Sequence, residues 1–323
     1  MTLPRQVLPG SSYMITRRCS ERRFFLRPSP EVNQTYLYCL GLAAERHGLE
    51  ISSLCAMSNH CHETGDDVRG ELPNFAQQFH GNLARALNAH LGRGEAFWSP
   101  GTYSAVECAD REAMLERMVY VITNPVAAGL VERPEEWPGL CTLPEDVGVK
   151  VYEVERPKWF FHDPERVDDD HGPETGRDRR RRRGRGRAPL PERVRLKITK
   201  PRAFADMPDD EFRRLLRARV DERLAELHAQ RREAGLRYLG AKAILAQDPF
   251  DAPAGGTHPD GSRNRRIACT DKWKRVERLR SLVEFWTAHA EARAAFSNSI
   301  HDVLFPPGTW AAVRVYGARA SPP

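Results

Sequence analysis

Two histidines two positions apart are the first residues of this chain that could do chemistry. They lie in the stretch AMSNHCHETGDD, residues 56–67, directly after a run typical of a β-strand. Because side chains two apart on a strand point to the same face, His60 and His62 should project together while Cys61 points to the opposite face. Two imidazoles on one face supply half of a metal site, which needs a further ligand from a neighbouring element. The alternative is an exposed polar pair.

The segment YVITNPVAAGLV, residues 120–131, offers that further ligand. Tyr120 and Asn124 are four apart, so on a helix they share one face. An amide oxygen suits Mg²⁺ or Mn²⁺, and a tyrosine hydroxyl beside such an ion is a credible nucleophile toward a phosphodiester. Without an ion, a half-buried core aromatic at 120 and a helix C-cap at 124 explain the same residues.

Hydrophobic spacing predicts the elements that must position these side chains. Helices are expected at 31–48, 72–92 and 110–124, the last ended by Pro125, and strands at 12–16, 49–57 and 102–108. The histidines would lie on or next to a further strand. This split β-α-β order predicts an α+β protein with a ferredoxin-like antiparallel sheet and helices on one face.

Four motifs together carry a resemblance to a known family. They are MSNHCH (57–62), FWSPGTY (97–103), YVITNPVAAGLV (120–131) and WPGLC (137–141). In this combination, residues 8–145 resemble the REP-associated tyrosine transposases, a branch of the single-tyrosine HUH nucleases. The resemblance implies an HUH fold that cuts single-stranded DNA, usually beside a hairpin, with Mg²⁺ or Mn²⁺.

The same resemblance implies roles for individual residues. His60 and His62 match the family's metal-binding histidines, with Cys61 at the intervening bulky position, while Tyr120 matches the catalytic tyrosine and Asn124 the amide-bearing third ligand. In that chemistry the tyrosine attacks phosphorus and forms a 5′-phosphotyrosine link. The released 3′-hydroxyl can later reverse the step on another DNA end, which suits strand transfer.

The residues after the second histidine depart from the family pattern. Relatives continue with an apolar strand, whereas ETGDDVRG supplies Glu63, Asp66 and Asp67. We therefore expect a short or distorted strand with these acids in a solvated turn. The alternatives are extra oxygen ligands for the metal or repulsion of DNA phosphate. A lost strand would favour a protein that binds DNA without cutting it.

Basic residues follow the first predicted strand. Arg17, Arg18, Arg22 and Arg23 could contact phosphates, and a base could stack on nearby Tyr13. A solvated turn explains these arginines equally well.

The net charge of +6 comes from one segment. Residues 171–200 hold twelve Lys or Arg against three acids, so the rest of the chain is slightly acidic. Gly, Pro and like charges at this density cannot pack a core, and a domain boundary is expected there. The segment is either a linker without specific contacts or a phosphate-contacting arm that includes Arg180, Arg181, Arg182 and Arg183.

The C-terminal part predicts helices at 206–235, 236–250 and 271–300 and a closing strand at 308–317. These basic, amphipathic helices could form a small DNA-binding module or a lobe that packs on the first domain. We therefore expect three parts: residues 1–165 as an HUH catalytic domain, 166–200 as an arginine-rich linker and 201–323 as a mostly helical C-terminal domain.

Composition excludes several classes of protein. The seven cysteines are an odd number without C-x-x-C spacing, so neither a disulfide framework nor a cysteine zinc cage is indicated. No apolar run approaches a membrane span and no signal-peptide core follows the N-terminal charge, so we expect a cytoplasmic protein without membrane contact. The histidines other than the H-x-H pair form no ligand-spaced cluster and are expected on the surface or on helices.

These observations predict a metal-dependent tyrosine DNA transposase or endonuclease that acts as a monomer or homodimer. Its substrate would be single-stranded or hairpin DNA, with Tyr120 as nucleophile and His60, His62 and Asn124 as metal ligands. The competing hypothesis is a domesticated nucleic-acid-binding protein without nuclease activity. A third is a metal-dependent hydrolase that uses water in place of Tyr120.

Overall fold

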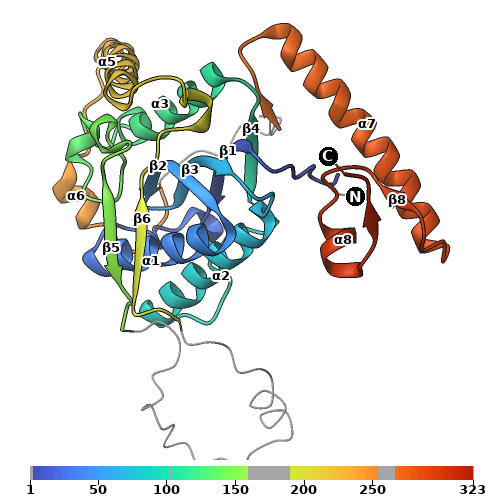
Figure 1. The fold of residues 1–323 in the computed structure, drawn as a ribbon. Helices are drawn as coiled ribbons and strands as arrows, with labels where there is room; N and C mark the ends of the chain where they lie inside the picture. Colours follow the sequence, from blue (N-terminus) through green and yellow to red (C-terminus); the bar gives the residue numbers. More distant parts are fainter. Residues whose placement is uncertain (1–2, 102, 159–189, 254–265, 323) are drawn as a thin grey trace, which may run out of the picture.

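A mixed five-stranded sheet with helices on both faces forms the centre of the molecule (Figure 1). The computed structural model describes residues 3–101, 103–158, 190–253 and 266–322. The strands follow the order β2-β3-β1-β4-β7, with bounds Leu49–Met57, His60–Asp67, Ser11–Arg18, Ser104–Cys108 and Ile267–Ala268. Neighbours are antiparallel except β4 and β7, which are parallel. The protein is therefore α+β, as predicted. The expectation of an antiparallel sheet with helices on one face is wrong in two respects, because β7 joins the sheet parallel to β4 and helices cover both faces.

Helices α1 (Pro30–His47) and α2 (Leu72–His90) pack together on one face of the sheet, and α3 (Arg111–Ala127) lies on the other. The chain thus runs β1-α1-β2-β3-α2-β4 before α3. Helix α1 lies close to its predicted range, 31–48. The Ser29 hydroxyl accepts from the Val32 amide at 3.1 Å, and Gly48 ends the helix at φ 72°.

The expectation of a short or distorted strand after His62 is wrong. Strand β3 pairs with both β1 and β2 through to Asp67, and Glu63, Asp66 and Asp67 are fully buried rather than solvated. Each acid has a hydrogen-bond donor that offsets its burial. Asp67, for example, accepts the amides of Glu71 and Leu72, both at 2.8 Å, at the start of α2. Pairing with both neighbouring strands, together with hydrogen bonds to the buried acids, therefore stabilises this polar sequence as an inner strand.

Helix α3 begins as predicted but does not stop at Pro125. Its first turn is capped by Asp110, whose Oδ1 accepts the Ala113 amide at 2.6 Å. The helix continues to Ala127, and the Ala128 amide donates to the Asn124 carbonyl at 2.9 Å. A proline in the last turn is tolerated here because the amides that follow it still find partners.

The C-terminal half extends this framework. Its elements are β5 (Val151–Glu155) and β6 (Arg193–Lys197), which pair antiparallel, the helices α5 (Asp209–Glu233), α6 (Ala241–Leu245), α7 (Lys272–Ser297) and α8 (Ala311–Tyr316), and β8 (Leu304–Phe305) and β9 (Arg319–Ala320), which pair parallel. In the part of the chain that the structure describes, 3₁₀ turns lie at Ser20–Arg22, Pro134–Glu136, Pro144–Asp146 and Arg202–Phe204. The strand predicted at 308–317 is wrong, because α8 occupies most of that range. None of the described helices has the length and apolar character needed to cross a bilayer.

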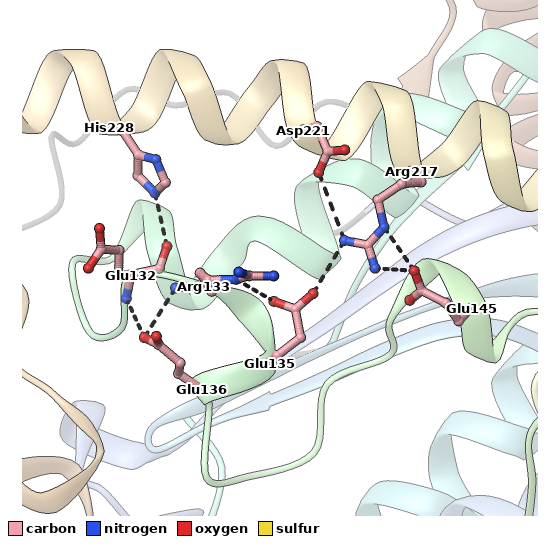
Figure 2. A network of polar contacts seen from close by, with 8 residues as sticks. All are labelled: Glu132, Arg133, Glu135, Glu136, Glu145, Arg217, Asp221 and His228. Atoms are coloured by element: carbon pink, nitrogen blue, oxygen red, sulfur yellow. Dashed lines mark hydrogen bonds and ion pairs between the residues drawn. The ribbon is translucent and has the colours of Figure 1, made fainter.

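Helix α5 packs on α3 and shares its core (Figure 1). Its buried side chains are Phe212, Leu216, Val220, Leu224 and Leu227. Figure 2 shows the polar contacts beside this interface, where the Arg217 guanidinium reaches Glu145 at 2.9 Å and Glu135 at 3.3 Å. The predicted division into domains stays a prediction, and these contacts run across its boundary at 200.

Candidate active site

The structure brings the two histidines and the tyrosine together on the α3 face of the sheet. Ring centroids lie 4.8 Å apart for His60 and His62, and 5.3 Å apart for His62 and Tyr120, with both ring pairs nearly perpendicular. The histidines come from the start of β3 and the tyrosine from the middle of α3. Tyr120 is 43% exposed, so its side chain is reachable from solvent.

His62 sits at the centre of the group and its ring is fixed from both sides. Its Nδ1 is 2.8 Å from the hydroxyl of Thr16, which lies directly opposite it on β1. Its Nε2 is 3.5 Å from the Asn124 amide nitrogen. A half-turn of that amide places Oδ1 there instead. Two ligand atoms at right angles around an ion, each about 2.1 Å from it, are ~3.0 Å apart. The His62 ring and the Asn124 amide therefore need to move only slightly closer together to bind the same ion.

The electrostatics favour the form of His62 that binds metals. Burial lowers the pKa of His62 well below its usual 6.5, and the nearby charges of His60 and Arg18 lower it further. The ring is therefore neutral at pH 7, as metal ligation requires. His60 Nδ1 is 2.7 Å from the Asn59 side-chain oxygen, which orients the second imidazole.

Arg18 is the predicted arginine that belongs to this site. It lies directly opposite His60 on β1. Partial burial and Arg22 lower the pKa of Arg18, whereas the Tyr120 phenol raises it, so the phenol is within electrostatic reach of the guanidinium. A cation at this position can neutralise charge on a phosphate or on a developing phenolate.

Arg22 lies within electrostatic reach of Arg18, whereas the other predicted arginines are placed differently. Arg17 points to the opposite face of β1, where its Nη2 donates to the Gly101 carbonyl at 3.3 Å. Arg22 lies in the turn after β1 with φ 60°, and Arg23 pairs with Glu21 at 2.9 Å. Arg180, Arg181, Arg182 and Arg183 are outside the described residues.

A pocket of about 420 Å³ is lined in part by the residues that follow β1, just after the point where the Cys19 amide donates to the Asn59 carbonyl at 2.8 Å. Its lining combines arginine and aromatic side chains, including Arg23, Arg93, Phe25 and Phe250. The Arg93 guanidinium lies 3.6 Å from the centre of the Phe25 ring. Aromatic faces and guanidinium groups are the surfaces on which single-stranded nucleic acids stack and neutralise charge.

Sequence reasoning missed two residues that orient the histidines. The position of Thr16 beside His62 follows from strand register. Asn59 precedes His60 within the MSNHCH motif, but no role was predicted for it.

Sequence reasoning was also wrong about His80. That residue lies on α2 as a helix residue but is 3% exposed, and its ring is close to Cys61 and Glu63. The ligand atoms of these three residues all lie within 4.8 Å of one another. The expectation that no further histidine joins a ligand-spaced cluster is therefore corrected.

No family model and no curated protein matches this chain. Among solved structures, it is similar to a REP-associated tyrosine transposase bound to a REP hairpin, with 15% identity and a TM-score of 0.39 over 45% of this chain and 84% of that one. A candidate transposase from Deinococcus radiodurans R1 is similar at 23% identity and a TM-score of 0.27, over 33% of this chain and 85% of that one. The chain is thus structurally similar to transposases over part of its length, as its motifs predicted. Its function has to be inferred from the geometry of the site.

Proposed function

We propose that this protein is a metal-dependent tyrosine endonuclease of the transposase type, which cuts single-stranded or hairpin DNA. The observation that carries the proposal is the contact of Tyr120 with His62, in a group that also holds His60, Asn124 and Arg18. The residues proposed as nucleophile, metal ligands and phosphate-binding cation come from three elements, α3, β3 and β1.

The donor set fits a divalent ion. Two imidazoles and one amide oxygen leave open positions for phosphate oxygens, which is how Mg²⁺ and Mn²⁺ are usually held. When bound by His60, His62 and Asn124, such an ion would polarise the scissile phosphate. The supporting observation is that Thr16 and Asn59 already orient the two rings.

The chain's own residues supply the remaining chemistry. The Tyr120 hydroxyl loses its proton to solvent and its oxygen bonds to phosphorus, while the bond from phosphorus to the 3′-oxygen breaks and that oxygen takes up a proton. Arg18 stabilises the phenolate and the charge that develops on the phosphate. The product is a 5′-phosphotyrosine, whose retained bond energy allows a free 3′-hydroxyl to reverse the step and join strands.

The fold that positions the site supports the same proposal. The β1-α1-β2-β3-α2-β4 order with antiparallel strands in the order β2-β3-β1-β4 matches the ferredoxin-like plan expected of an HUH nuclease. The binding-only alternative was motivated by a broken strand after His62, and that strand is intact. The water-dependent hydrolase stays distinguishable by experiment.

The test uses labelled single-stranded hairpin oligonucleotides with Mg²⁺ or Mn²⁺, run on denaturing gels. Native protein should form a covalent protein–DNA adduct that chelator abolishes and that Tyr120→Phe does not form. Tyr316→Phe is the matched control, since Tyr316 is an exposed tyrosine on α8 and should leave the adduct intact.

Two outcomes would replace the proposal. Cleavage that survives in Tyr120→Phe without an adduct would indicate attack by water. Hairpin binding without cleavage, by native protein with either ion and across a library of genomic hairpins, would indicate a nucleic-acid-binding protein.

A further inference from the structure

A second group of potential ligands lies on the other face of β3. Cys61 and Glu63 alternate with the active-site histidines, so they point toward α1 and α2, where His80 meets them. All three side chains are buried, and their sulfur, oxygen and nitrogen atoms lie within 4.8 Å of one another.

The polar atoms of this group are only partly satisfied, because Cys61, Glu63 and Tyr36 hydrogen-bond among themselves while other atoms of the group have no partner within the ranges that the structure describes. Glu63 Oε1 accepts a hydrogen bond from the buried hydroxyl of Tyr36, but Glu63 Oε2 has no hydrogen bond among the described residues. Neither ring nitrogen of His80 makes one of normal geometry in that part of the chain, although the Ala76 carbonyl lies near the ring. Orphaned atoms of this kind call for a ligand, an ion or water.

We propose that Cys61, Glu63 and His80 bind a transition-metal ion of the Zn²⁺ class. A thiolate, an imidazole and a carboxylate are the donors that Zn²⁺ prefers, and they differ from the harder set at the active site. Binding releases the thiol proton to solvent. The ion, the thiolate, the carboxylate and the neutral imidazole then sum to zero charge, which a buried site tolerates.

The charges around the cluster act differently on its members. Burial and the nearby Arg17 guanidinium lower the pKa of His80 to about 3, so its ring is neutral, as metal ligation requires. The ligand atoms must close in by about 1 Å to reach tetrahedral bond lengths of 2.0–2.3 Å. Tyr36, which already contacts Glu63, is the adjacent group able to provide a fourth oxygen.

The role of this site is structural. It lies across the sheet from Tyr120, and its ligands join β3 to α2, which holds the strand bearing His60 and His62 in register. It therefore stabilises the active site without touching substrate.

Purified full-length protein tests the proposal without any nuclease assay. Equilibration with Zn²⁺ followed by dialysis should leave bound zinc whose X-ray absorption spectrum contains one sulfur ligand, and Co²⁺ should show a thiolate-to-metal absorption band. Both signals should be lost in Cys61→Ser and in His80→Ala. They should persist in Cys39→Ser, a matched buried cysteine on α1, and in His62→Ala.

The spectra of native protein test for the proposed metal site even where a variant fails to fold. Bound zinc without a sulfur ligand, or no zinc retained by native protein, would overturn the site. The same follows if folded His80→Ala keeps the sulfur-ligated metal. None of these results bears on adduct formation by Tyr120.

Discussion

At the scale of single residues, the candidate site depends on groups that orient rather than react. Residue types and spacing were enough to select His60, His62, Tyr120 and Asn124, and the structure brings these four together. Their roles stay predictions. Thr16 could not be selected from the sequence, because only the β1–β3 register places its hydroxyl on His62.

Thr16→Val is the residue-scale test of this orientation. It keeps the β-branched shape but removes the hydroxyl that sits 2.8 Å from His62 Nδ1. Loss of such a partner typically weakens metal binding by about 10–100-fold. A titration of Mn²⁺ binding should show this loss with little change in melting temperature. Thr287→Val, an exposed threonine on α7, is the control, and equal affinity in the two variants would contradict the orienting role.

At the scale of elements, pattern predicted the long helices, missed the short helix α8 and misjudged the character of strand β3. The spacing of Phe75, Phe79 and Leu83 predicts α2 because that face is apolar, and the structure buries it. No such pattern of apolar residues predicts strand β3, because the burial of its acidic side chains depends on hydrogen-bond donors far away in the sequence. Asp66 accepts the Arg202 amide at 2.9 Å, a contact across 136 positions that no local pattern reveals.

The start of α3 gives a pH-dependent prediction. Partial burial tends to raise the pKa of Asp110, but hydrogen bonds from the Cys269 thiol and from the amides of Ala113, Asp271 and Thr270 outweigh it and lower that pKa to about 2. The folded state therefore holds fewer protons than the unfolded state, whose Asp titrates near 3.8. The stability this carboxylate provides is complete above pH 4 and is lost as the pH falls through about 2.

Urea unfolding of native protein and Asp110→Asn measures this effect. Asn still caps a helix, so the variant removes the charge more than the cap. Native protein should be more stable by about 1 kcal/mol at pH 7, as expected of hydrogen bonds to a charged acceptor, and the difference should vanish toward pH 2. A difference that is the same at pH 7 and pH 2.5 would show that the charge of Asp110 has no part in holding α3.

At the scale of the whole molecule, helix α5 belongs to the same core as the elements around the site, whereas α7 packs in separate clusters. Leu216 of α5 is fully buried against α3, the helix that carries Tyr120. Leu216→Ala should therefore cost about 2–5 kcal/mol and shift a single unfolding transition of the whole protein. Leu279→Ala, on an exposed part of α7, should cost under about 1 kcal/mol. Two separable transitions, with only one shifted, would instead support an independent domain after 200.

The arginine-rich segment at 177–187 gives a prediction about charge rather than fold. It holds eight arginines and one aspartate, and without it the protein would lose its net positive charge. Replacing these eleven residues by an uncharged Gly-Ser stretch of equal length keeps the reach of the chain between Glu155 and Arg193. If the segment contacts phosphates, single-stranded DNA should bind more weakly and with a shallower salt dependence, by about 0.7 in logarithmic slope for each phosphate that the variant no longer neutralises.

The rate of adduct formation should not depend on this segment, in contrast to the affinity for DNA. At saturating DNA the replacement variant should still form the Tyr120 adduct at the native rate, because the ligands, the nucleophile and Arg18 are unchanged. Arg18→Gln should behave in the opposite way, with slower adduct formation and a small effect on the salt slope. Fluorescence titrations over a range of salt concentrations, paired with single-turnover gels, measure both quantities. An unchanged salt slope in the replacement variant would assign the segment to a linker, since charge that contacts phosphate cannot be removed without releasing fewer counterions on binding.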